Sequence, residues 1–115
     1  MQLRDDQLIR LSDHHRRRRI FFTRAELNRL LGIYSRRVAA GLWRDYAIDQ
    51  QPGSVIFSIF RSSLERPLYS IAKHAGAGQQ AAQFVLMSGR QVLTQSRTLD
   101  EVIELLERRP TLVPV

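Results

Sequence analysis

Val55-Ile56-Phe57-Ser58-Ile59-Phe60 is the stretch that decides the fold, because every residue in it except Ser58 is apolar. A strand with one solvated face carries an apolar residue only at every second position. This run instead predicts a strand that is buried on both faces of a sheet. The preceding Gln51-Pro52-Gly53-Ser54 has proline and glycine in series, which is typical of a turn.

Further strands are expected on both sides of this run. Upstream, residues 42–49 alternate, with Leu42, Arg44, Tyr46 and Ile48 on one face and Trp43, Asp45, Ala47 and Asp49 on the other. Downstream, residues 68–74 form a strand, and residues 83–87 and 90–96 form a hairpin about Ser88-Gly89. A two-residue turn there places Val85 opposite Val92 and Phe84 opposite Leu93.

Two helices enclose the strands in the sequence. Thr23-Arg24-Ala25-Glu26 is a capping box, and Gly41 suits the left-handed residue that ends a helix, so a helix is predicted over residues 24–40. Its apolar positions recur at helical spacing: Leu27, Leu30, Leu31, Tyr34 and Val38. Thr98-Leu99-Asp100-Glu101 is a second capping box, which opens a helix that Pro110 stops.

The order of helix, about five strands and helix predicts an α+β fold. Short connections favour a largely antiparallel sheet with both helices packed on one face. The chain of 115 residues supports one domain. We expect that domain over residues 20–109, after a mobile basic leader (1–19) and before a tail (110–115).

Composition excludes several classes of protein. Without cysteine there is no disulfide, no cysteine-zinc site and no thiol nucleophile. Apolar runs are too short to span a membrane, and the acids Asp5 and Asp6 do not fit a signal peptide, so a cytoplasmic protein is expected. His14, His15 and His74 show no metal-ligand spacing. We therefore expect no metal site, no cofactor and no catalytic residue.

Positive charge is concentrated in the first part of the chain. The net charge is +7, and seventeen of the eighteen cations are arginine. Residues 1–44 carry eleven arginines against four acids, whereas residues 45–115 carry seven of each sign. Such a cluster predicts contact with nucleic acid or an acidic protein, and a solubilising leader is the alternative interpretation, which the shortness of the four-arginine run favours. The candidate binding residues are Arg16, Arg17, Arg18, Arg19, Arg24, Arg29, Arg36 and Arg37.

A second group of charged residues lies in the middle of the sequence. The candidate pocket comprises Trp43, Arg44, Asp45, Asp49, Arg61, Glu65 and Arg66. An arginine there would bind a carboxylate or phosphate through its planar guanidinium. Cross-strand ion pairs on the surface are the alternative interpretation. Trp43 either lies in the core or faces a partner.

Several of these segments resemble a known family. They are Phe22-Thr23-Arg24-Ala25-Glu26-Leu27, Trp43-Arg44-Asp45-Tyr46-Ala47-Ile48-Asp49, Phe57-Ser58-Ile59-Phe60-Arg61 and Glu65-Arg66-Pro67-Leu68-Tyr69. Over roughly residues 20–107 the chain resembles a family of short bacterial proteins catalogued as domain of unknown function 2794. The resemblance implies no activity, ligand or catalytic residue.

Three functions stay open from the sequence. The first is a non-enzymatic binding or regulatory module that engages an anionic partner through its amino-terminal arginines. The second is a small-molecule sensor or enzyme that uses the central Arg/Asp/Glu group. The third is a subunit that forms a homodimer, or docks on another protein, through a sheet edge or the Trp43 face.

Overall fold

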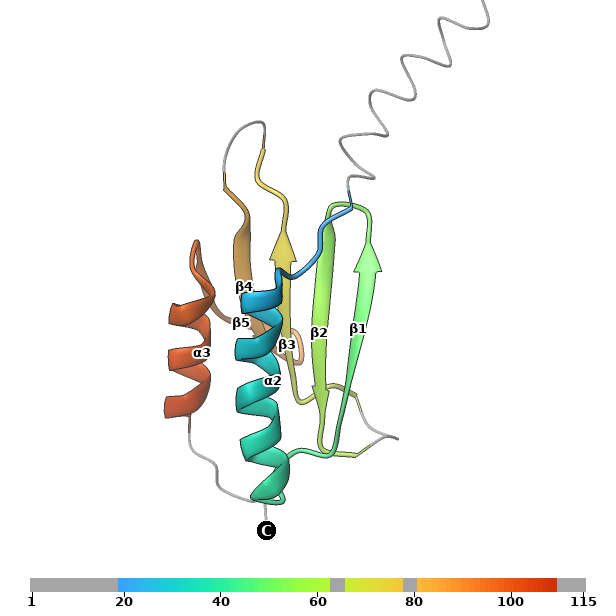
Figure 1. Ribbon diagram of the computed structural model, residues 1–115, viewed down its shortest axis with the longest axis vertical. Coiled ribbons are helices and arrows are strands. Elements are labelled where there is room, and N and C mark those ends of the chain that lie inside the picture. The colour runs from blue at the N-terminus through green and yellow to red at the C-terminus, as the bar shows by residue number, and fades with distance from the viewer. Residues whose placement is uncertain (1–18, 63–65, 78–80, 110–115) are drawn as a thin grey trace, which may run out of the picture.

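The computed structural model describes residues 19–62, 66–77 and 81–109. Its elements follow the predicted order of helix, five strands and helix (Figure 1). They are α2 (Arg24–Ala39), β1 (Asp45–Gln51), β2 (Ser54–Phe60), β3 (Tyr69–His74), β4 (Gln83–Ser88), β5 (Gln91–Ser96) and α3 (Leu99–Arg108). The expected leader, apart from Arg19, and the tail lie outside the described residues.

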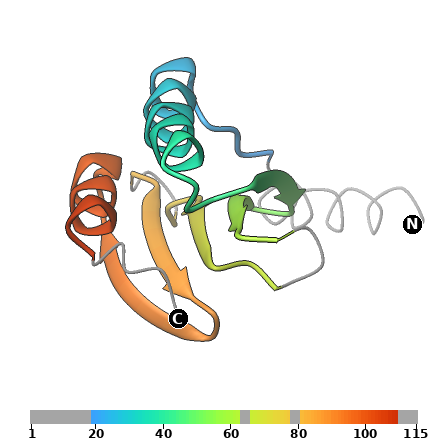
Figure 2. The same ribbon diagram turned by 90° about the horizontal axis from the view of Figure 1, so that it is seen from below.

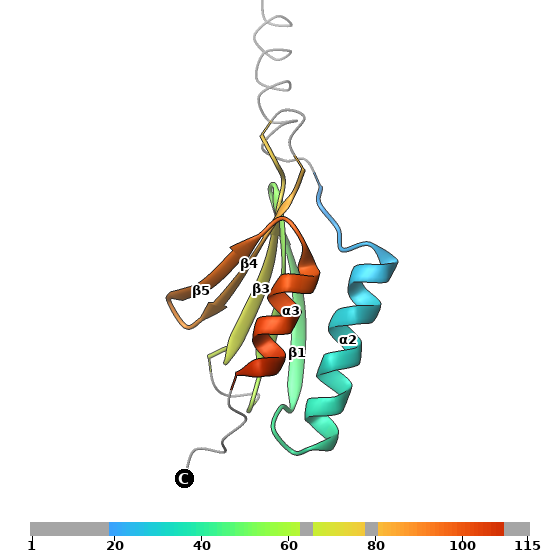
Figure 3. The ribbon, with the colours of Figure 1, turned by 90° about the vertical axis from the view of Figure 1, so that its left-hand side faces the viewer.

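The five strands form one sheet in sequence order. Every neighbouring pair is antiparallel, as short connections require. Both helices cover the same face of this sheet (Figure 2). They lie side by side there (Figure 3), and α3 also packs against β4 and β5. The predicted α+β fold is confirmed.

The core is centred on β2, as the doubly apolar run predicts. Phe57 faces Ile48 of β1 on one side and Ile71 of β3 on the other. Phe57 and Ile59 are fully buried on the helix-covered face, and Ser58 on the opposite face is only 7% exposed. The helices contribute their apolar stripes to the same core: Leu30 and Ile33 from α2, and Leu99, Val102, Ile103 and Leu106 from α3.

Helix α2 begins and ends where its sequence predicts. The Thr23 hydroxyl accepts from the Glu26 N–H, and the Glu26 carboxylate accepts from the Thr23 N–H at 2.8 Å. After Ala40 the chain turns at Gly41 with φ of +78°, a conformation that is strained for other residues. The residues before α2 run along the sheet, because Gln50 Nε2 donates to the Ile20 carbonyl at 3.0 Å.

The predicted start of the first strand is wrong. Strand β1 begins at Asp45, and Leu42 and Trp43 belong to the connection, where both N–H groups donate to the Arg37 carbonyl. The alternation therefore does not extend to Trp43, which does not share the face of Asp45 and Asp49. Its indole lies in the core at 6% exposure, so of the two alternatives the core location is confirmed.

The predicted register of the hairpin is also wrong. Ser88 pairs with Gln91, so Gly89 and Arg90 are the turn residues, and Gly89 has φ of +60°. A two-residue hairpin turn with a positive φ at its first central residue favours glycine at that position. The turn therefore lies one residue later in the chain than predicted. A β-bulge beside Leu86 and Met87 shifts the register again, so Val85 faces Gln95 and Phe84 faces Ser96.

The second capping box is only half formed. Thr98 Oγ1 accepts from the Glu101 N–H at 3.4 Å. The Glu101 carboxylate, however, accepts from Ser96 Oγ at 2.7 Å, and Ser96 Oγ in turn accepts from the Thr98 N–H at 3.0 Å. Ser96, which ends β5, therefore bonds to the two groups, the Glu101 carboxylate and the Thr98 N–H, that the predicted box joins directly.

Candidate functional site

The charged surface that the fold assembles lies at one end of the molecule. At this end α2 and α3 finish, β1 and β3 begin, and β2 ends (Figure 1). The Arg44 N–H donates to the Phe60 carbonyl at 2.8 Å, and the Leu68 N–H donates to the Ile59 carbonyl at 2.7 Å. These bonds bring the connections on either side of β2 together. We call this end the basic end, for its arginines: Arg36, Arg37, Arg44, Arg61, Arg66, Arg108 and Arg109.

Few acids balance the basic end. Among the described residues it holds seven arginines against three carboxylates, those of Asp45, Glu104 and Glu107. The opposite end holds five cations and four carboxylates. More than half of the arginines at the basic end come from residues after position 60, within the part of the sequence that is neutral as a whole. The fold therefore gathers arginines from both parts of the sequence at one end of the molecule.

The helix ends explain four of these arginines. Arg36 and Arg37 lie in the last turn of α2, Arg108 lies in the last turn of α3, and Arg109 caps it. Cations are favoured there because the carbonyl ends of helices carry partial negative charge. Arg36 pairs with Glu107 at 3.2 Å, and Arg108 pairs with Glu104 at 3.9 Å.

Two other arginines have no such neighbours. Within the described part of the chain, Arg44 and Arg66 form no ion pair, and both are exposed. Their positive charges are therefore accessible from solvent and not neutralised by a described carboxylate. Because an exposed guanidinium loses little on exchanging water for a phosphate or carboxylate, both can bind an anion bidentately.

A cluster of aromatic rings underlies the basic end. Tyr46 stacks on Phe57 with centroids 5.1 Å apart and meets the edge of Tyr34 at 4.8 Å. Trp43 lies 6.3 Å from both Tyr34 and Tyr69. The cluster contains the single tryptophan and all three tyrosines of the chain. It joins α2 to the first three strands and forms the packed layer beneath the basic end.

Two arginines of the basic end lie over rings of this aromatic cluster. The Arg37 guanidinium lies 6.0 Å from the Trp43 ring centroid, and that of Arg109 lies 5.7 Å from the Tyr69 ring. Arg109 Nε also donates to the Tyr69 hydroxyl at 3.1 Å. Burial, with the nearby Asp45 carboxylate and Tyr46, raises the pKa of Tyr34 above its usual value.

The structure only partly assembles the predicted central pocket. Arg44, Asp45, Arg61 and Arg66 lie at the basic end, where β1 begins beside the end of β2. Asp49 lies further along β1 on the exposed face and pairs with Ile56 of β2. Trp43 is buried beneath the site, and Glu65 lies outside the described residues.

The predicted amino-terminal binding arginines do not form one group in the structure. Arg29 donates to Asp100 and Arg36 to Glu107, while Arg37 donates to the Glu107 carbonyl at 3.1 Å. These three side chains therefore join α2 to α3. Arg24 is exposed at the start of α2, and Arg19 is exposed where the described chain begins. Arg16, Arg17 and Arg18 lie outside the described residues.

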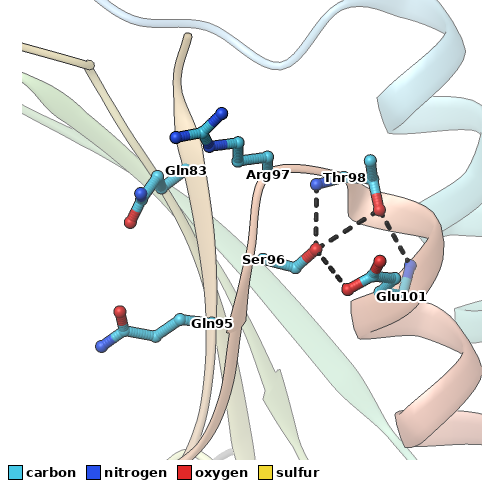
Figure 4. Close-up of a pocket in the computed structure, with 6 residues that line it drawn as sticks. All are labelled: Gln83, Gln95, Ser96, Arg97, Thr98 and Glu101. Carbon is cyan, nitrogen blue, oxygen red and sulfur yellow. Dashed lines mark hydrogen bonds between the residues drawn. The ribbon is translucent and has the colours of Figure 1, made fainter. Parts of the chain in front are cut away.

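An open groove of about 410 Å³ lies at the opposite end of the molecule (Figure 4). Its polar groups already satisfy one another: Ser96 Oγ bonds to Glu101, to Thr98 Oγ1 and to the Thr98 N–H. The capping motif at Thr98 is the only sequence signal for this groove. Among residues 19–62, 66–77 and 81–109, no three histidine, aspartate or glutamate side chains gather in a way that would hold a metal ion.

Comparison with protein families identifies the chain. A family model described as "Protein of unknown function (DUF2794)" matches residues 20–103. The chain belongs to the DUF2794 family. This result confirms the resemblance found in the sequence, and the match extends from Ile20, beside β1, into α3.

The other two comparisons found no relative. No curated protein and no solved structure matches the chain. No described helix has the length and apolar character needed to cross a membrane. The DUF2794 description carries no activity, so a function has to be argued from the basic end.

Proposed function

We propose that this DUF2794 protein is a non-enzymatic binding module that engages an anionic macromolecule, nucleic acid in the first place, through its basic end. The observation that carries the proposal is the excess of seven arginines over three carboxylates at that end. The arginines come from both helices and from two connections between elements, so the positive surface is broad. A broad surface suits an extended polyanion better than a small ligand.

The chemistry of the cations supports a phosphate partner. Arginine presents a planar set of donors that matches phosphate oxygens, and seventeen of eighteen cations in the chain are arginine.

The amino-terminal run Arg16–Arg19 is a second part of the proposal. Its last residue joins Ile20, whose carbonyl is held by Gln50 near the end of β1. Arg19, the one described residue of the run, therefore lies at the end of the molecule that is opposite to the basic end. Substitutions can separate the contributions of the two regions.

Titration of a fluorescently labelled single-stranded oligonucleotide tests the proposal. We expect an affinity that falls steeply with salt concentration, because binding releases counterions from the phosphates. Arg44→Ala with Arg66→Ala should weaken binding and make the slope of log K against log salt shallower by about 1.4, because each phosphate that an arginine neutralises contributes ~0.7 to that slope. Arg24→Ala with Arg97→Ala removes the same charge at the other end and serves as the matched control.

The outcomes distinguish the alternatives. Equal weakening in the two double variants would mean that net charge rather than the basic end governs binding. Weakening confined to a variant with Arg16–Arg19 replaced by alanine would move the site to that run. If no oligonucleotide binds at low salt, while a pull-down captures a protein despite nuclease treatment, the anionic partner is an acidic protein instead.

A further inference from the structure

Strand β1 forms an open edge of the sheet. It pairs with β2 without interruption from Asp45 to Gln51, and its other side faces no strand of the described chain. The opposite edge strand, β5, is broken by a β-bulge and leads directly into α3, which packs against it. Bulges and covering helices protect sheet edges from association. Of the two edges, β1 is the one that can accept another strand.

The helix-side surface next to this edge is apolar and only partly covered by α2. Tyr46 is 39% exposed and Ile48 is 44% exposed, although both side chains point to the face that carries the helices. In Figure 1 neither helix lies in front of β1. Val38, at the end of α2, is 38% exposed. Large apolar residues in neighbouring positions at an open edge indicate a surface that is buried in an assembly.

We propose that β1 pairs in antiparallel fashion with β1 of a second copy of this chain, with Ile48 facing Ile48 across a two-fold axis. This register pairs all seven residues of the strand, because Ile48 is its midpoint. It opposes Tyr46 to the partner's Gln50 and brings Tyr46 diagonally next to the partner's Ile48. Two five-stranded sheets would then become one continuous sheet, with the exposed apolar side chains at its centre.

Charge selects the same register. With Ile48 on the axis, Asp45 faces the partner's Gln51 and Asp49 faces the partner's Ala47, so no carboxylates oppose each other. An axis at Ala47 would place Asp45 against the partner's Asp49, and an axis at Asp49 would oppose Asp49 to itself. Like charges directly opposite each other destabilise a strand pair. Only the central register avoids that repulsion while using the full strand.

The main chain also fits this arrangement. The Tyr46 N–H donates to the Asp45 carboxylate at 2.8 Å, which is the kind of local bond that satisfies an outward amide at a free edge. Alternation along an antiparallel strand then gives Ile48 and Gln50 the same outward orientation. The central register pairs these three residues with one another, as hydrogen bonding between the strands requires. In the dimer the Tyr46 N–H would donate to the partner strand instead of to Asp45. The Asp45 carboxylate would then accept from the side-chain amide of the partner's Gln51.

Light scattering on the full-length chain tests the proposal. We expect a mass of twice 13.3 kDa for the unmodified chain at about 100 μM and a single-chain mass for Ile48→Arg. The matched control is Val92→Arg, because Val92 is 47% exposed beside the opposite edge. This variant should stay dimeric. A monomer at the highest concentration, or a dimer that survives Ile48→Arg, would overturn the proposal.

Cross-linking provides a second test that does not depend on weakening the interface. The chain contains no cysteine, so Ile48→Cys introduces a single thiol on the proposed axis. A short bismaleimide should link two Ile48→Cys chains at concentrations where Val92→Cys chains stay unlinked. Equal cross-linking of the two variants, or none at position 48, would contradict the register. Neither test depends on the anion-binding proposal, so the two can fail separately.

Discussion

Lys73, the only lysine of the chain, places its ammonium group 2.7 Å from Glu26 Oε1. The same carboxylate oxygen accepts from the Thr23 N–H and so caps α2. Lys73 Nζ also donates to the Phe21 carbonyl at 2.8 Å. One ion pair thus joins the start of the first helix, the segment before it and the third strand of the sheet. At 13% and 21% side-chain exposure it is the least exposed ion pair in the described chain.

Removing the charge of Glu26 should therefore destabilise the fold. We expect Glu26→Gln to lower the free energy of unfolding by about 1–3 kcal/mol, because Lys73 keeps its charge in a partly desolvated place and the cap is weakened. The measurement is urea denaturation at neutral pH. Glu107→Gln is the control, since it breaks the exposed pair with Arg36 and should cost no more than about 1 kcal/mol. Equal destabilisation of both variants would contradict this view of the Lys73 pair.

Stability should fall at high pH because of Tyr34. Burial and the neighbouring Asp45 raise the pKa of Tyr34 above 10.0 in the folded chain. Above about pH 10 the unfolded chain then binds fewer protons at this phenol than the folded chain, so the free energy of unfolding decreases as pH rises. Tyr34→Phe should make the decrease shallower in denaturation curves collected from about pH 9 to about pH 11. An unchanged slope would contradict the effect.

Two glycines near α2 should respond to alanine in opposite directions. Gly32 lies inside the helix, and an added Cβ would lie 3.6 Å from Arg36 Nη1, an ordinary contact. We expect Gly32→Ala to stabilise the protein by about 0.5–1 kcal/mol. Gly41→Ala should destabilise it by about 1–2 kcal/mol, because its φ of +78° is strained for alanine. Thermal melts of both variants check the signs.

Trp43 should report a buried environment. The indole is 6% exposed and lies beneath the Arg37 guanidinium. We expect its fluorescence to be shifted to shorter wavelength and to resist quenching by iodide, and both properties should disappear in denaturant. As the single tryptophan of the chain, Trp43 needs no correction for other residues. Efficient quenching in the native state would place the indole on the surface instead.

Features that depend on neighbouring residues in the sequence were predictable. The cap at Thr23, the left-handed residue at Gly41 and the doubly buried strand at residues 55–60 all appear as expected. Each is specified within one turn of helix or one strand by local hydrogen bonding or by burial. The family membership followed from the same kind of local pattern.

Features that depend on how two segments meet were not predictable with the same accuracy. The hairpin register was wrong because the turn and the β-bulge near Leu86 are settled by pairing between β4 and β5. The sheet face predicted for Trp43 was wrong because strand β1 starts only at Asp45, the first residue that pairs with β2 through Phe60. The carboxylate of Glu101 bonds to Ser96 because the end of β5 lies beside the start of α3.

The sequence by itself determined the order of elements, the burial of the second strand and a net charge of +7 carried almost wholly by arginine. Only the tertiary structure decided where that charge lies. Antiparallel folding brings alternate connections to the same end, so Arg61, Arg66 and Arg109 join Arg36, Arg37 and Arg44, while Asp49, Asp100 and Glu101 lie towards the other end. A count along the chain cannot show this separation, because it arises from the reversal of direction at each turn.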